Sequence, residues 1–94
     1  MGIADELITR GWHQGEAEAP TGEVCLAGAA AYALFNTTFD DLSLHDLSAA
    51  MNAVEAAAPE IAKHGVGNWN DAPERTFDEV LRVAKEADEI LDAQ

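Results

Sequence analysis

The chain has 94 residues, 48% of them hydrophobic, and its 18 acidic and 5 basic residues give a formal net charge of −13. This length corresponds to a single domain over residues 1–94, and the apolar runs are shorter than the ~20 residues that span a membrane. Five basic residues cannot form an extended basic patch, so direct binding to nucleic acid or to an anionic membrane is disfavoured.

The N-terminal residues 3–12 have the periodicity of an amphipathic helix, with Leu7 and Ile8 on its apolar face. Residues 13–22 are polar and contain helix-breaking residues, which predicts a loop. Because Asp5 precedes any basic residue, the start of the chain does not resemble a signal peptide. We therefore expect a cytoplasmic protein.

Residues 23–35 form the least polar stretch and predict a central helix, since a helix that is apolar on all sides is normally buried. A short strand over 24–26 is the alternative, but the alanine run favours a helix. Gly28 costs about 1 kcal/mol within a helix, which predicts a close approach by a neighbouring backbone. Cys25 is the only cysteine, and we expect it to be a small buried side chain rather than a reactive thiol.

Residues 36–42 predict a connection in which Phe39 anchors the chain to the core. Ser43 is suited to be the N-cap of a long helix, which should break near Ala58. A short helical turn over 59–63 follows, because proline starts a helix well but does not fit within one.

The last helix begins at a predicted capping box, in which Thr76 and Glu79 satisfy each other's backbone amides. Residues 67–75, before this helix, predict a loop of fixed shape. The fold class is therefore all-α, a small irregular or orthogonal bundle of four main helices plus a short turn helix, with 23–35 at its centre and the last helix covering it. The predicted core takes apolar residues from every element: Leu7, Ile8, Leu26, Ala29, Ala30, Ala33, Leu34, Leu47, Met51, Val54, Ile61, Trp69, Phe77, Val80, Leu81, Ala84 and Leu91.

Two segments, 11–15 and 68–75, combine tryptophan with polar residues and predict a binding surface. Tryptophan and arginine are enriched at interface hot spots. The candidate ligand-binding or partner-binding residues are Trp12, His13, Gln14, Trp69, Asn70, Asp71 and Arg75.

A structural role for these residues is the alternative interpretation. Trp69 would then pack against Phe77 at the start of the last helix, and Arg75 would pair with Asp71 or Glu74 to hold the loop. Trp12 would attach the first loop to the core.

No pattern predicts catalysis, a metal or a cofactor. His13, His45 and His64 lie in separate segments, and no pair has the i, i+4 spacing of a helical zinc site. Carboxylates such as Asp40 and Asp41 are adjacent in sequence rather than convergent, as general acid–base chemistry would require.

Three segments taken together resemble the signature of an uncharacterised family of small proteins from actinobacteria and their phages. They are Gly-Trp-His-Gln-Gly at 11–15, Val-Cys-Leu-Ala-Gly-Ala at 24–29 and Trp-Asn-Asp-Ala-Pro-Glu-Arg-Thr at 69–76. The resemblance implies a source in an actinobacterium or its phage and a small accessory or host-interaction role. It implies no activity, because that family has no known function.

The function expected from these observations is a small, acidic, non-enzymatic protein that binds a host or phage protein, and a basic partner would suit its charge. Solubility alone would also explain the charge. One alternative is a small-ligand binder or enzyme with a pocket between 11–15 and 68–75, which requires these segments to meet in space. Another is a homodimer formed through an alanine-rich face.

Overall fold

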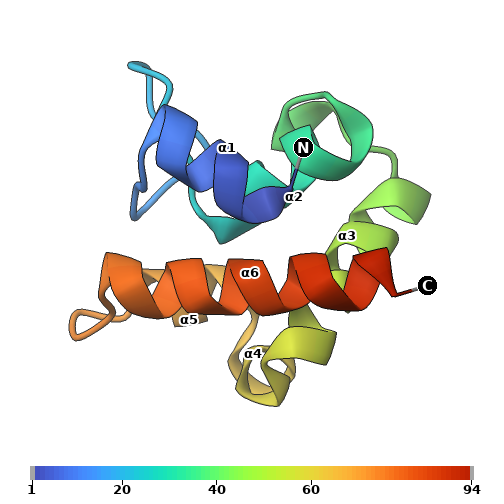
Figure 1. Cartoon of the computed structure of the whole chain (residues 1–94). Coiled ribbons are helices and arrows are strands. Elements are labelled where there is room, and N and C mark those ends of the chain that lie inside the picture. Colours follow the sequence, from blue (N-terminus) through green and yellow to red (C-terminus); the bar gives the residue numbers. More distant parts are fainter. Residues whose placement is uncertain (1, 94) are drawn as a thin grey trace.

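The computed structural model describes residues 2–93 and shows an all-α protein (Figure 1). The elements in chain order are α1 (Ile3–Arg10), α2 (Leu26–Phe35), the 3-10 turn η1 (Phe39–Asp41), α3 (Leu44–Ala57), α4 (Pro59–His64), α5 (Val66–Asp71) and α6 (Phe77–Asp92). The all-α class and the four main helices α1, α2, α3 and α6 are confirmed. The short α4 is also present. The prediction of a loop over 67–75 is wrong in its first half, which forms α5.

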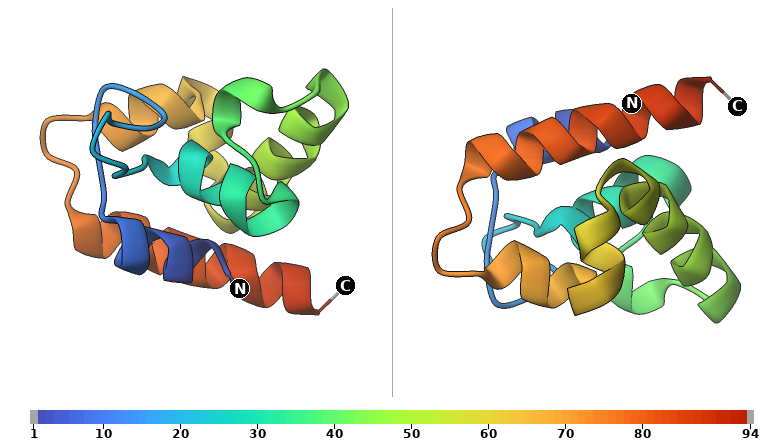
Figure 2. Two further views of the ribbon diagram at one scale, coloured as in Figure 1. Left: turned by 90° about the horizontal axis from the view of Figure 1, so that it is seen from above. Right: turned by 90° about the horizontal axis from the view of Figure 1, so that it is seen from below.

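Helix α2 lies at the centre of the bundle and contacts α1, α3, α5 and η1. Helix α6 packs mainly on α1 and α3 rather than directly over α2, which corrects the predicted arrangement. Figure 2 shows α1 lying along α6, with the beginning of α1 near the end of α6. Helices α4 and α5 pack against each other, and in Figure 1 α4 lies below α6 while α5 lies behind it.

Helix α2 begins at Leu26 rather than at residue 23, because the preceding residues are extended. The backbone N–H of Val24 donates to the carbonyl O of Gly11 at 2.9 Å, and its carbonyl O accepts from the N–H of His13 at 2.9 Å. Val24 also forms isolated β-bridges with Trp12 and Glu18. The loop before α2 is thereby tied to the base of the central helix.

The close approach predicted at Gly28 is confirmed. A Cβ at this position would overlap the backbone carbonyl O of Ala17, which itself accepts a hydrogen bond from the N–H of Cys25 at 3.1 Å. Gly28 therefore lets the 11–25 loop pass directly over the first turn of α2.

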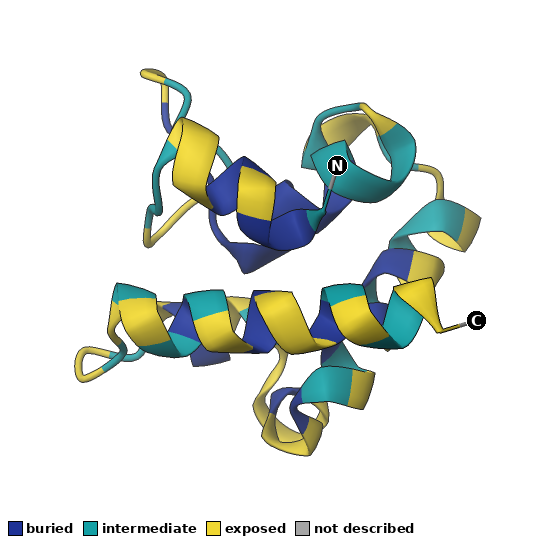
Figure 3. Ribbon diagram, viewed as in Figure 1, coloured by how far each residue is buried: buried dark blue, intermediate teal, exposed yellow. Residues whose placement is uncertain are grey.

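The core lies where α2 meets its neighbours, and Figure 3 shows buried and exposed residues alternating along α6. Nine of the predicted core residues are buried: Leu7, Leu26, Ala29, Ala30, Val54, Ile61, Trp69, Val80 and Ala84. Ile8 was predicted to be buried but is 58% exposed. It lies beside the buried stripe of α1, which Ile3, Ala4 and Leu7 form. Phe39 is only partly buried and lies outside the core cluster, so its predicted anchoring role is wrong.

The predicted N-caps of α3 and α6 and the break near Ala58 are confirmed, whereas α1 ends at Arg10 rather than at residue 12. Ser43 Oγ accepts from the N–H of Asp46 at 3.1 Å, and α3 stops before Ala58, whose backbone is extended. Thr76 and Glu79 form the reciprocal capping box, with distances of 3.2 Å and 3.1 Å.

The cap of α1 comes from a distant residue. Its N-cap is Gly2, which has no side chain to offer. The carboxylate of Asp88 on α6 instead accepts from the N–H groups of Ile3 at 2.7 Å and Ala4 at 3.1 Å. This contact fixes the start of α1 on α6.

Candidate functional site

Asn70 on α5 is fully buried and links three parts of the chain. Its Oδ1 accepts hydrogen bonds from Trp12 Nε1 at 2.9 Å and from the backbone N–H of Leu26 at 3.1 Å. Its Nδ2 donates to the carbonyl O of His13 at 3.1 Å and to Asp71 Oδ1 at 3.0 Å. An amide side chain offers two acceptor lone pairs and two donors. Every hydrogen-bonding position of Asn70 is therefore used within the protein.

The neighbouring residues Gln14 and Gly15 extend this contact. Gln14 Nε2 donates to the carbonyl O of Asn70 at 3.0 Å and of Ala72 at 3.1 Å, and the N–H of Gly15 donates to Asp71 Oδ1 at 2.9 Å. The last carbonyls of a helix have no partner within the helix, so Gln14 caps the C-terminal end of α5. The two tryptophan-containing segments thus meet in space, as the ligand-binding alternative requires.

Arg75 lies over the ring of Trp69, with its guanidinium carbon 4.0 Å from the ring centroid. Its Nε donates to the carbonyl O of Trp69 at 2.8 Å, and its Nη1 pairs with Glu79 Oε2 at 3.0 Å. The predicted partners Asp71 and Glu74 are therefore wrong. Because residues four apart face each other on a helix and its cap, Glu79 is the carboxylate within reach of Arg75.

Trp12 and Trp69 occupy different environments. Trp12 stacks on Phe77, with ring centroids 6.2 Å apart and an angle of 12° between the planes. Trp69 is 4% exposed and is covered by Arg75. Trp12 therefore makes the stacking contact with Phe77, the residue against which we expected Trp69 to pack.

His13 differs from the other predicted residues, since its Nε2 is buried without a hydrogen-bond partner and lies 3.8 Å from Glu16 Oε1. The seven predicted residues gather in one place. The side-chain polar groups of Trp12, Gln14, Asn70 and Asp71 join the 11–15 segment to α5. Arg75 instead joins α5 to α6, through the carbonyl O of Trp69 and the carboxylate of Glu79. These contacts stabilise the packing of the first loop, α5 and α6.

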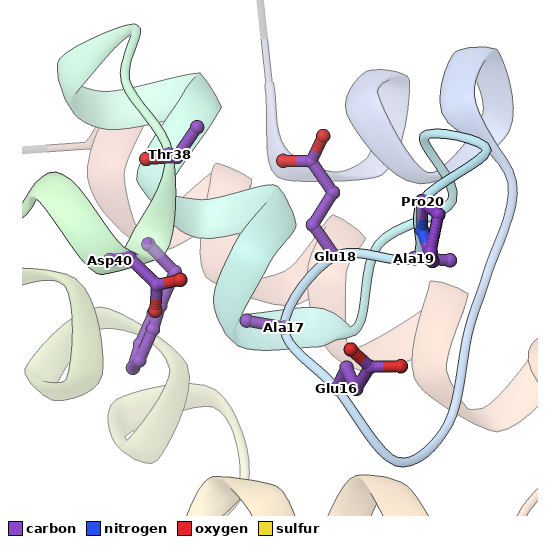
Figure 4. A pocket seen from close by; sticks show the side chains of 8 residues that line it. Glu16, Ala17, Glu18, Ala19, Pro20, Thr38 and Asp40 are labelled. Carbon is purple, nitrogen blue, oxygen red and sulfur yellow. The ribbon is translucent and has the colours of Figure 1, made fainter.

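A recess of about 560 Å³ opens beside this cluster, between the segment 16–20 and η1. Figure 4 shows Glu16 and Glu18 on one side of it and Asp40 on the other. Phe39 also lines the recess, and its lining contains no basic side chain. We call this feature the acidic recess. Its volume lies in the ~300–1,000 Å³ range of ligand-binding pockets.

Glu18 is held at the acidic recess by a chain of contacts that ends in a buried carboxylate. The Tyr32 hydroxyl donates to Glu18 Oε1 at 2.6 Å, and this hydrogen bond raises the pKa of Tyr32. The Arg10 guanidinium carbon lies 3.6 Å from the Tyr32 ring centroid, and its Nε pairs with Glu6 Oε1 at 2.9 Å. Arg10 pairs with the buried Glu6, and neither Arg10 nor His13, whose Nε2 lies 3.8 Å from Glu16 Oε1, is part of the recess lining.

Sequence reasoning missed the acidic recess. The sequence pattern places Glu16 and Glu18 in a polar loop over 13–22 and Asp40 in the connection over 36–42. The recess forms only because the fold brings together residues that are more than twenty positions apart in the sequence. No local sequence pattern indicates that they become neighbours. The one weak indication in the sequence is Phe39, because a large aromatic residue within a polar connection can mark a binding surface.

Cys25 is 6% exposed, as predicted, and its Sγ accepts from the N–H of Gly28 at 3.5 Å as the N-cap of α2. Burial raises the pKa of its thiol, and a protonated thiol is a poor nucleophile. Within residues 2–93, no three histidine, cysteine, aspartate or glutamate side chains converge in a way that could hold a metal ion. No helix in that described range is long and apolar enough to cross a membrane.

These features define a small acidic all-α protein with a hydrogen-bonded polar cluster and a carboxylate-lined recess. A family of unknown function, DUF6197, matches residues 2–89, and the chain belongs to this family. No curated protein and no solved structure matches the chain. Membership of a family without known activity agrees with the resemblance found in the sequence.

Proposed function

We propose that this protein is a non-enzymatic interaction protein that binds a basic segment of another protein at the acidic recess. The observation that carries the proposal is the lining of this recess, where Glu16, Glu18 and Asp40 gather without a basic side chain. Opposite charges across an interface increase both the rate of association and its specificity. The net charge of −13 adds long-range attraction for a basic partner.

A second recess, of about 440 Å³, also contains carboxylates but is a weaker candidate. It lies between the start of α1 and the end of α6 and includes Asp88. The carboxylate of Asp88 already accepts hydrogen bonds from two α1 amides. A ligand there would compete with the cap of a helix.

The alternative of a small ligand or substrate held between the 11–15 and 68–75 segments has less support. The segments do meet, but Asn70 has no free hydrogen-bonding position and Gln14 caps α5. Reacting groups need to be free to contact a substrate. Trp12, Trp69 and Arg75 are therefore structural residues that stabilise the fold beside the binding surface.

The proposal also covers the cellular location of the protein and its source. We infer a role in the cytoplasm, with which the free, buried thiol of the single cysteine is compatible. The family resemblance described above supports an actinobacterial or phage source, in which case a phage protein would act on a partner in the host cytoplasm. Self-association as a homodimer is less suited to the charge, since two copies would repel each other.

The test compares two variants with the same net charge. Glu16→Gln, Glu18→Gln and Asp40→Asn together neutralise the recess, and Gln at position 18 still accepts the hydrogen bond from Tyr32. The control carries Glu74→Gln, Glu86→Gln and Glu89→Gln, three exposed residues at or near α6. Both proteins lose three negative charges.

Binding of an arginine-containing peptide is measured by calorimetry at about 0.15 M ionic strength, where long-range charge effects are screened. We expect the recess variant to bind about tenfold more weakly than the control variant. Equal binding by the two variants would show that only net charge matters and would reject the proposed site.

A further inference from the structure

An apolar recess lies directly beside the acidic recess. Its volume is about 180 Å³, and it shares Glu16, Ala17 and Phe39 with its larger neighbour. Most of its remaining lining is apolar or small and comes from the base of α2 and from α5: Cys25, Ala27, Val66 and Gly67. The two recesses are therefore adjacent parts of one surface depression.

Phe39 lines both recesses. It is a large aromatic residue that remains partly exposed outside the core cluster, although the sequence predicts an anchor. Leaving an aromatic ring exposed forgoes the free energy of burying it. Local departures from the expected pattern of burial are typical of functional positions.

The sizes and charges of the two recesses indicate what each would hold. A cavity of about 150 Å³ lined by apolar side chains holds one benzene molecule, so the apolar recess matches one branched aliphatic side chain. The acidic recess combines carboxylates with an aromatic ring, and arginine pairs with carboxylates while its guanidinium plane stacks on aromatic rings.

We propose that the two recesses form one bipartite site for an extended segment of a partner protein, with an arginine in the acidic recess and a leucine or valine in the apolar recess. This inference rests on the proposed function and specifies its partner. In an extended chain, alternate side chains lie on one face about 7 Å apart, so a segment with one residue between its two anchors presents both to the same surface.

A second copy of this chain is the competing occupant, because Leu44 is 84% exposed and could enter an apolar recess. Charge argues against it. Leu44 follows Asp40 and Asp41 and precedes Asp46, so a second copy would bring carboxylates to a site that already has carboxylates. A basic partner segment is complementary, whereas a second copy is repelled.

The experiment titrates the ¹⁵N-labelled protein with four short capped peptides in a glycine–serine background. They carry arginine and leucine separated by one residue, arginine alone, leucine alone, or neither. Two further proteins carry substitutions at Gly67, where an added Cβ would meet no atom within 4 Å. Gly67→Leu adds a large side chain at the lining of the apolar recess and is designed to narrow it, and Gly67→Ala is the matched control that adds only a methyl group.

We expect wild type and Gly67→Ala to bind the arginine–leucine peptide about tenfold more tightly than the arginine peptide. Gly67→Leu should lose this gain and bind both peptides alike. The largest amide shifts should fall at Gly15, Phe39 and Gly67, and the spectrum also shows whether each variant is folded.

Two negative results have different meanings. If leucine gives no gain but neutralising Glu16, Glu18 and Asp40 still weakens binding, the bipartite site is wrong and the proposed function stands. If neutralising these carboxylates changes nothing relative to the α6 control, the proposed function fails as well. Dimerisation in sedimentation that Gly67→Leu abolishes would identify a second copy as the occupant and overturn the inference.

Discussion

Trp12 and Asn70 are 58 positions apart in the sequence, yet the indole Nε1 of one donates to the side-chain oxygen of the other at 2.9 Å. This hydrogen bond joins the first loop to α5. The same oxygen accepts from Leu26 at the start of the central helix. A buried amide with all four positions satisfied specifies one arrangement of these three segments.

Replacing Asn70 by alanine should therefore destabilise the protein strongly. The change leaves the Trp12 indole, the Leu26 amide and the His13 carbonyl without their partner, and buried unsatisfied groups cost about 1–3 kcal/mol each when water cannot reach them. We expect a loss of about 3–5 kcal/mol in the free energy of unfolding, toward the lower end of the sum of these costs, measured by urea denaturation.

Asn68→Ala on the same short helix is the control. Asn68 is exposed, and its one hydrogen bond is to the carbonyl O of His64. Its loss should cost less than about 1 kcal/mol. Similar effects at the two positions would show that Asn70 does not organise the loops.

Asp88→Ala should weaken the attachment of α1. This carboxylate replaces the missing side-chain cap at Gly2 by binding two amides of the first turn, and loss of a helix cap costs about 0.5–2 kcal/mol. Hydrogen exchange should become faster at the amides of Ile3 and Ala4 in particular. The exposed neighbour substitution Glu89→Ala should leave that exchange unchanged.

Two glycine-to-alanine substitutions should have opposite signs. At Gly28 the added methyl group would overlap the carbonyl O of Ala17, which cannot move without disturbing the loop, and we expect destabilisation by about 1–3 kcal/mol. At Gly67 the methyl group meets open space, and the better helix propensity of alanine should stabilise α5 by up to about 1 kcal/mol. Thermal unfolding of both variants measures the difference, and a gain in stability at Gly28 would contradict the close approach of the loop.

Glu79 should make a pH-dependent contribution to stability. The hydrogen bond from the backbone N–H of Thr76, helped by Arg75, lowers the pKa of Glu79 below its usual 4.5. A carboxyl whose pKa is lower in the folded state stabilises the protein above its unfolded pKa, and this contribution disappears as the pH falls through the folded pKa. The stability difference between wild type and Glu79→Gln should therefore be largest near neutral pH and shrink below about pH 4.5.

Comparing the two proteins at each pH removes the effect of the many other carboxylates. Glu86→Gln, an exposed change on the same helix, is the control for the loss of one negative charge. A wild-type advantage that stays constant down to pH 3 would mean that the capping box does not depend on the charge of Glu79.

The helices with strong local signals were predictable. Ser43, Thr76 and Glu79 act on amides within three residues, so their roles are visible in the sequence, and the break at Pro59 follows from the proline ring itself. The buried character of residues 26–31 also follows from composition alone.

Helix α5 was not predictable, because six residues are too few to form a stable helix in isolation. Its carbonyl groups are satisfied by Gln14 from the first loop and by Arg75 from the segment after it. The sequence pattern of Asn70, Asp71 and Pro73 resembles that of a turn, and the tertiary hydrogen bonds override it.

The sequence by itself determined the all-α class, the main helices, the N-caps of α3 and α6, the buried alanine-rich segment and the excess of negative charge. These properties depend on composition and on contacts within about one helical turn. Only the tertiary structure decided that Asn70 would receive Trp12, that Asp88 would cap α1, and that Glu16, Glu18 and Asp40 would line one recess with Phe39. Those contacts join residues far apart in the chain, and which of many polar groups become neighbours depends on how the helices pack.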